Sequence, residues 1–501
     1  MRKVIEPQMQ LGEEAIGAIR LDRKSRDDIP QLLQGLQHLY ITPEVRERVF
    51  AILEEVLPER KGEGESDKAD PNTGRPGMSQ WTILVLSVLR LGLNADYDRI
   101  QELANQHSTL RQMLGHSDWA DETYYELQTL KDNLRLFTPD ILDRINQEVV
   151  RAGHQALKKS PEDGVIGRCD SFVVETDVHF PTDINLLLDA IRKTIDTCVK
   201  LSEENDLSGW RQHAYHQRQF KKQYRQVQRL KHSTSKDENK RQRKQEEIQE
   251  AHRVYLELAQ SHLARAEQSR QQIDPRDPVA FVRLQELDNY MDHARRQIEQ
   301  IDRRVLQGER IPHEEKVFSL FEPHTEWICK GKAGVPVELG LRVNVVEDRD
   351  RFILHHQVME KTTDDQVAIA MVDETQQRFP RLRAISMDKG FHSPANKAAL
   401  KERLDCVVLP KKGRCSQADK ARESEPEFSQ LRKEHSAVES AINALEQHGL
   451  DKCPDHGIEG FKRYIGLAVV ARNIQRLGAV LRQQEHEKEE RKRGPYKKKA
   501  A

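Results

Sequence analysis

The stretch GRCDSFVVETD at residues 167–177 decides the fold that we expect for this chain. Its run of apolar and β-branched residues predicts a strand that is buried in a sheet. The strand carries a carboxylate, Asp170, in a position that looks buried. We therefore take Asp170 as the first candidate for a functional residue.

Two more acidic residues lie on predicted regular structure. The stretch AISMDKG (384–390) predicts a strand that ends on Asp388, and RKEHSAVESAI (432–442) predicts a helix that carries Glu439. Two strand aspartates and one helical glutamate supply the hard oxygen ligands that Mg²⁺ prefers, and Mn²⁺ is expected to substitute. A pair of such ions can hold the attacking and leaving oxygens of a phosphodiester. The three acids together predict metal-dependent phosphoryl transfer on a nucleic acid.

Asp177 is an alternative to Asp170 on the first strand. Side chains alternate along a strand, so Asp170 and Asp177 lie on opposite faces and only one can face Asp388. Each acid also has an ordinary structural explanation. Asp170 is then a strand-end turn residue, Asp388 a helix cap and Glu439 a surface charge.

The composition predicts a soluble protein of two to four domains. The chain has 501 residues, of which 33% are charged and 37% hydrophobic, and its formal net charge is −1. The average charge does not indicate a nucleic-acid partner, but residues 488–499 form a short basic segment. That segment fits either contact with phosphates or a solvated, disordered end.

The cysteines and the apolar runs indicate the compartment. The six cysteines have no paired spacing, which argues against a zinc site and a disulfide framework and fits a reducing cytoplasm. The longest apolar run, residues 81–91, is interrupted by polar residues and is too short to span a bilayer. We expect a cytoplasmic protein without a membrane partner.

The first 160 residues predict helices throughout. We expect an N-terminal helical segment at 1–75, which ends in a polar linker at 61–76, and a helical DNA-binding domain at 76–160.

Within the second region, residues 96–104 and 108–115 predict two short helices around a tight turn, the second capped by Ser108. Such a pair is typical of a helix-turn-helix, in which Arg99 and Arg111 could meet phosphates or base edges. The same pair also occurs in helical domains that do not touch DNA.

Residues 184–310 predict a long helical insertion with a coiled-coil pattern. Apolar residues there step by three and four along two seams. They are Ile248, Ala251, Tyr255 and Leu258 in the first seam, and Leu284, Leu287, Met291, Ala294, Ile298, Ile301 and Val305 in the second. Pro275 and Pro278 break the helix between the seams. An antiparallel hairpin and a parallel intermolecular coiled coil both fit this pattern.

Residues 161–183 and 311–483 predict a single α/β domain, followed by a basic tail at 484–501. The predicted strands after the insertion are 335–345, 351–356, 382–388 and 406–409. The predicted helices are 363–379, 393–404, 431–448 and 461–483.

These elements follow the order of an RNase H-like core that is interrupted by the insertion. The residues around the acids carry a more specific resemblance: DSFVVETDVHFPTD (170–183), FEPHTEWI (321–328) with KGK (330–332), and DKGF (388–391). Over residues 75–480 the chain resembles bacterial insertion-sequence transposases of the DDE class, and among these the ISNCY group.

The resemblance implies an α/β RNase H-like catalytic core with an all-α N-terminal domain and a helical insertion after the first core strand. It also implies cleavage of DNA at the ends of the element and joining of a 3′ hydroxyl to target DNA, with Asp170, Asp388 and Glu439 holding two Mg²⁺ ions. The implied partners are the terminal inverted repeats, the target DNA and a second copy of the chain, at the bacterial nucleoid.

The chain departs from the family at one signature. Many related transposases surround the glutamate with Tyr-x2-Arg-x3-Glu-x6-Lys, whereas Arg432, His435 and Glu446 stand at those places here. The phosphate contact of that signature is therefore not carried over, and Lys389, Arg432 and Lys433 are candidate DNA contacts by proximity alone. An RNase H-like nuclease without strand transfer and a non-catalytic DNA-binding coiled-coil scaffold are the alternatives.

Overall fold

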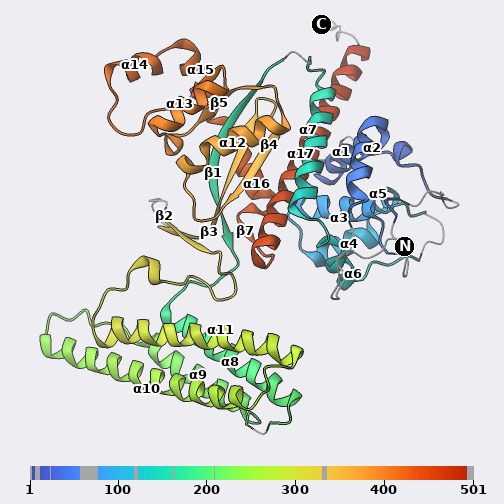
Figure 1. The fold of residues 1–501 in the computed structure, drawn as a ribbon. Coiled ribbons are helices and arrows are strands. Elements are labelled where there is room, and N and C mark those ends of the chain that lie inside the picture. Colours follow the sequence, from blue (N-terminus) through green and yellow to red (C-terminus); the bar gives the residue numbers. More distant parts are fainter. Residues whose placement is uncertain are drawn as a thin grey trace, which may run out of the picture. The chain divides into compact units, whose positions relative to one another are not determined.

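The structure is a computed structural model that describes residues 3–5, 9, 12–22, 24–56, 77–117, 122–160, 163–207, 209–329 and 336–493. Two compact units make up the chain (Figure 1). The sheet unit comprises the described parts of residues 1–177 and 328–501, and the helical unit comprises those of residues 178–327. The expected linker at 61–76, the KGK motif at 330–332 and the tail beyond residue 493 lie wholly or mostly outside the described residues.

A mixed sheet forms the centre of the sheet unit. Its five main strands are β1 (Val165–Thr176), β3 (Val337–Asp348), β4 (Ile353–Met359), β5 (Leu382–Met387) and β6 (Cys406–Val408). β1 pairs antiparallel with β3 on one side and parallel with β5 on the other, β3 pairs antiparallel with β4, and β5 pairs parallel with β6. The resulting order β4-β3-β1-β5-β6 is that of an RNase H-like core, as the sequence predicts. Two short strands, β2 (Glu326–Cys329) and β7 (Lys452–Cys453), adjoin β3 and β1.

Helices follow the later strands in the predicted order. They are α12 (Asp364–Arg378), α13 (Pro394–Arg403), α14 (Gln417–Glu423), α15 (Pro426–His435), α16 (Ala437–Leu445) and α17 (Gly457–Arg493). Thr363 caps the start of α12 in a capping box. Its side chain accepts a hydrogen bond from the Gln366 amide, and the Gln366 side chain accepts one from the Thr363 amide. The sequence predicts a single helix at 431–448, but the structure has two helices there, because the helix is interrupted at Ser436 between α15 and α16.

The N-terminal helices share one hydrophobic core with the sheet and α17. They are α1 (Ile29–Ile41), α2 (Pro43–Leu53), α3 (Gln80–Gly92), α4 (Tyr97–Gln106), α5 (Ser108–Met113), α6 (Leu127–Leu134) and α7 (Pro139–Ala156). Every residue of α3 is buried, and α17 packs against α1, α3 and α7 (Figure 1). In the expected helix-turn-helix, His107 rather than Ser108 is the cap of α5. Its ring nitrogen accepts from the Leu110 amide at 3.2 Å, whereas Ser108 is already helical.

The helical unit contains four helices that share a second core. They are α8 (Asp183–Glu204), α9 (His213–Arg229), α10 (Glu238–Gln271) and α11 (Pro278–Ile301). Two ion pairs join α10 and α11: Arg270 with Asp288, and Glu267 with Arg295. The residue that comes earlier on α10 pairs with the residue that comes later on α11. The two helices are therefore antiparallel, but the seam on α11 packs mainly against α8. None of the described helices is both long enough and apolar enough to cross a bilayer.

A buried amide pair joins α7 and α17 to the sheet. The Asn473 side chain accepts from the Ile353 amide at 2.9 Å and donates to the Ile353 carbonyl at 2.8 Å and to Asn146 Oδ1 at 2.6 Å. Asn146 also donates to the Ile353 carbonyl, at 3.1 Å. Both asparagines are 0% exposed, so water cannot replace a lost bond. These bonds fix the start of β4 against two long helices.

We expect Asn473→Ala to lower the free energy of unfolding by about 2–4 kcal/mol, because it opens a cavity and leaves the Ile353 amide without an acceptor. Urea denaturation of the full chain measures this change. Asn443→Ala, on the exposed side of α16, is the matched control and should shift the midpoint by less than about 0.5 kcal/mol. Equal effects of the two variants would contradict the role given to the amide pair.

Candidate active site at the β1–β5 junction

The register of β1 and β5 sets the first two acids side by side. The strands are parallel, and Cys169 pairs with Met387 at the end of β5. Asp170 and Asp388 each follow directly after that pair. Two residues that are more than two hundred positions apart in the sequence are thus neighbours at the carboxyl end of β5.

Three contacts hold α15, the helix that directly precedes the one carrying Glu439. Ser386 Oγ on β5 lies 3.0 Å from His435 Nδ1, and Arg168 on β1 donates to the Glu434 carbonyl at 3.3 Å. The Arg349 guanidinium adds an ion pair of 2.8 Å with the Glu434 side chain. The end of α15 is therefore held against β1 and β5. Glu439 lies in the first turn of α16, which itself packs on β1.

The strand edge next to Asp170 is open. β5 pairs with β1 only as far as Cys169, and β7 begins to pair only at Glu175. Between these points no described strand covers that edge of β1. This edge of β1 therefore has no described strand partner beside Asp170, and the side chains of Asp388 and Glu439 are exposed.

The acids interact electrostatically. Burial is the main cause that raises the pKa of Asp170 to about 6. The hydrogen bond from the Ser171 amide opposes this rise, and the carboxylates of Asp388, Asp364 and Glu439 add to it. Burial lowers the pKa of His435, although Asp388 and Glu439 act in the opposite direction. Asp388 and Glu439 are thus both close enough to Asp170 and His435 to interact with them electrostatically.

Asp364 is a fourth carboxylate at the site, and the sequence analysis missed it. It lies in the first turn of α12, and its Oδ2 would be 3.0 Å from a Cβ atom added at Gly390, so it adjoins the turn after Asp388. Its Oδ1 is buried and accepts no hydrogen bond. The signal in the sequence was the pair Asp364-Asp365 after a predicted strand, but such pairs commonly begin helices without any further role.

A different group of side chains brings its donor atoms closest together. Within the described ranges, only His154, Asp348 and Asp350 hold ligand atoms of three residues within 4.8 Å of one another. His154 Nε2 is 2.6 Å from Asp348, and Lys159 forms ion pairs with Asp348 at 3.7 Å and with Asp350. The Phe352 amide donates to the second Asp348 oxygen at 2.9 Å. The Lys159 ammonium already pairs with both carboxylates, so we assign this group a structural role.

Asp177 does not lie near the other acids. It is seven residues beyond Asp170, which corresponds to roughly 23 Å along a strand. Its carboxylate forms an exposed ion pair of 2.6 Å with Lys452, next to the pairing of β1 with β7. The geometry therefore favours Asp170 as the residue of the first strand.

The candidate DNA contacts differ in their surroundings. Arg99, Lys389 and Lys433 are exposed. The Arg111 guanidinium donates to the Thr123 carbonyl at 3.1 Å and thus holds the chain that follows α5. Arg432 forms an ion pair of 3.1 Å with Glu423.

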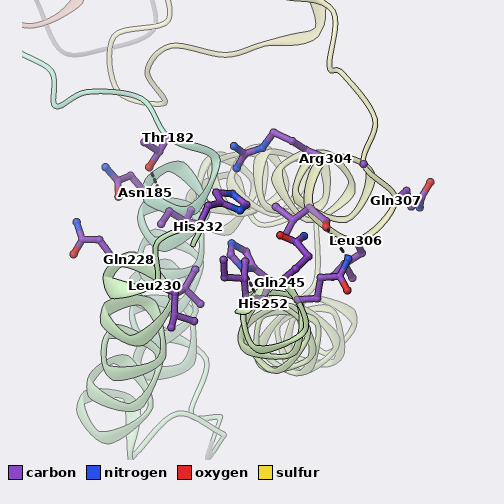
Figure 2. Close-up of a pocket in the computed structure, with 16 residues that line it drawn as sticks. Thr182, Asn185, Gln228, Leu230, His232, Gln245, His252, Arg304, Leu306 and Gln307 are labelled. Atoms are coloured by element: carbon purple, nitrogen blue, oxygen red, sulfur yellow. Dashed lines mark hydrogen bonds between the residues drawn. The ribbon is translucent and has the colours of Figure 1, made fainter. Parts of the chain in front are cut away.

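A polar pocket in the helical unit carries no acid. It has a volume of about 560 Å³ and lies at the carboxyl end of α9, where Gln228, Leu230 and His232 face Gln245, His252 and Arg304 (Figure 2). No Asp or Glu lines this pocket, so it offers no carboxylate ligands for a divalent cation.

The comparisons with known proteins bear on the sheet unit. Residues 323–474 match the family model of the transposase DDE domain. The matched range includes Asp388 and Glu439, and Asp170 precedes it. No curated protein and no solved structure matches the chain. This match supports the resemblance to insertion-sequence DDE transposases over that part of the chain, which carries a transposase DDE domain.

Proposed function

We propose that this transposase cleaves DNA at the ends of its element and joins the ends to target DNA, and that Asp170, Asp388 and Glu439 are its catalytic acids. One observation carries the proposal. The β1–β5 register makes Asp170 and Asp388 neighbours, and α16, which carries Glu439 in its first turn, packs on β1. The ISNCY group, the terminal repeats and a homodimer on DNA belong to the same proposal.

The residues at this edge fit divalent cations. All four side chains offer carboxylate oxygens, the hard ligands that Mg²⁺ and Mn²⁺ take, and the buried Asp364 Oδ1 has no other partner. The carboxylates also raise one another's cost of ionisation, as the pKa of Asp170 indicates. Two bound Mg²⁺ ions would supply charge to activate water or a 3′ hydroxyl and to stabilise the departing oxygen.

Backbone amides orient the two aspartates. The Ser171 amide donates to Asp170 Oδ1 at 2.8 Å, and the Lys389 amide donates to Asp388 Oδ1 at 2.6 Å. One oxygen of each carboxylate is thus fixed, and the other is left for a ligand. Since burial lowers the pKa of His435, this ring stays neutral at pH 7 and adds no cation of its own.

The crowding of the acids predicts a pH-dependent cost to stability. Because the folded-state pKa of Asp170, about 6, lies above the ordinary value of 3.8, its ionisation destabilises the fold as the pH rises between these values. In EDTA, Asp170→Asn should therefore stabilise the protein more at pH 8 than at pH 4.5, by about 1–3 kcal/mol in urea unfolding.

Added Mn²⁺ should make the wild type more stable than Asp170→Asn at pH 8. The cation stabilises the wild type by binding, whereas the variant has lost one of the carboxylates that would bind it. Asp177→Asn, which changes only an exposed ion pair, should behave like the wild type under both conditions. A wild type and an Asp170→Asn variant with the same pH dependence would contradict the clustering of the acids.

Removal of any one triad carboxylate should abolish the chemistry. We expect Asp170→Ala, Asp388→Ala and Glu439→Ala to lower the rate of Mn²⁺- or Mg²⁺-dependent nicking and strand joining by at least about 10³-fold, because each leaves a cation short of a ligand. The substrate is a plasmid that carries the element with its flanking DNA, and gel analysis separates nicked from joined products.

Asp177→Ala is the internal control and should keep its activity. An active Asp170→Ala together with an inactive Asp177→Ala would move the site along the first strand. Metal-dependent nicking without any joined product would favour the simple nuclease, and full activity of all three triad variants would overturn the proposed site.

A further inference from the structure

The positive charge of the helical unit is concentrated in one segment. Residues 211–244 contain twelve Lys or Arg and two acidic residues, a formal net charge of +10 in a chain whose total is −1. The segment comprises α9, the connection that follows it and the first turns of α10. α9 itself contains no Asp or Glu. The charges of the rest of the chain must therefore sum to −11, so the basic segment is a local feature.

The fold turns four of these cations to one side of α9. Arg218, Lys222, Arg225 and Arg229 follow one another at steps of four, three and four residues, which places them on one face of a helix. Phe220 and Val227 occupy the opposite face and are buried in the core of the unit. The four cations are exposed and span roughly 17 Å along the helix axis. We call them the α9 stripe.

Among the described residues, none forms an ion pair with the α9 stripe, in contrast to cations on the neighbouring helices. On α10 and α11, exposed cations such as Arg253, Arg270 and Arg295 form ion pairs with nearby acids. No acidic side chain in the described part of the chain pairs with any of the four stripe residues. A merely solvated helix face usually mixes both signs of charge, as α10 does. An unpaired, single-sign stripe instead attracts a polyanion.

The pocket at the carboxyl end of α9, like the stripe, has no acidic side chain in its lining. Gln228, Leu230 and His232 line it beside amide and imidazole groups, and it contains no carboxylate (Figure 2). Arg304 on its rim pairs with Asp183 at 2.7 Å. A backbone phosphate that lies along the stripe would therefore meet hydrogen-bond donors in this pocket, and the Asp183 carboxylate at its rim is already paired with Arg304.

We propose that the α9 stripe binds the phosphate backbone of duplex DNA without reading its sequence. The choice of duplex DNA rests on the proposed function, in which the chain acts on DNA. Lys and Arg side chains on an exposed helix face contact phosphates, and such contacts fix the position of a protein on the duplex. The stripe would thus hold DNA outside the active site, through a segment that the DDE-domain match at 323–474 does not include.

The test compares two sets of four substitutions in the full chain. The first is Arg218→Gln, Lys222→Gln, Arg225→Gln and Arg229→Gln. The matched control removes the same charge from exposed residues of the same unit by Arg253→Gln, Arg276→Gln, Arg295→Gln and Arg296→Gln. Fluorescence anisotropy with a labelled duplex of random sequence gives the dissociation constant between 50 and 300 mM salt, with EDTA present.

The stripe variant should weaken binding by at least about tenfold at the lowest salt and reduce the slope of log Kd against log salt by about 2–4, since each phosphate contact contributes about 0.9. The control should retain the wild-type slope. Protection of Lys222 from an amine-reactive reagent by unlabelled duplex, read by mass spectrometry on the wild type, is a second measure that needs no variant.

An unchanged slope in the stripe variant, an equal loss in both variants, or no protection of Lys222 would overturn the proposal. Loss of binding only to single-stranded RNA would overturn the choice of duplex DNA. Failure of the proposed function is distinguishable, because it would abolish metal-dependent nicking by the wild type while the difference between the two variants in EDTA persisted.

Discussion

The parallel pairing of β1 with β5 is the constraint on which the rest of the site depends. Hydrogen bonds between the strands fix the register at Cys169 and Met387, and the next residue on each strand is an aspartate. A shift of one position would turn Asp170 to the other face of the sheet. Pairing between strands that are far apart in the sequence thus brings the two aspartates together, which no local motif could do. The helical unit lies between these strands in the sequence and leaves their pairing intact.

This arrangement lowers the stability of the fold through electrostatic repulsion between carboxylates. Four carboxylates lie near one strand edge, and burial of Asp170 together with the charges of the other three raises its pKa to about 6. The hydrogen bond from the Ser171 amide opposes this rise but does not cancel it. The donor atoms of these carboxylates are spaced more widely than those of His154, Asp348 and Asp350, as expected for like charges that repel one another. The cluster costs stability without a cation, and a bound cation would recover it.

Much of the core followed from periodicity in the sequence. The strands and the helices of residues 335–409 were predicted within a few residues, because alternation and apolar runs are local signals. The positions of Asp170 and Asp388 on strands followed from the same signals. The choice between Asp170 and Asp177 could not be made from these local signals. It depends on which part of β1 pairs with β5 and which part pairs with β7.

Other features depend on tertiary contacts and gave no local signal. Asp364 adjoins the site only because α12 packs against the turn after Asp388. The break at Ser436 follows no proline or glycine, and the cap of α5 is a histidine, a residue that is not among the preferred caps. The heptad seam on α11 was visible, but its main partner, α8, has no seam of its own in the sequence analysis.

Anomalous diffraction from crystals of the full chain with DNA and Mn²⁺ tests the central claim most directly, because it locates the cations without reference to activity. The account predicts anomalous peaks between the carboxylates of Asp170, Asp388 and Glu439, with none at His154, Asp348 and Asp350. Peaks confined to that second group, or none beside Asp170 although DNA is bound, would contradict it.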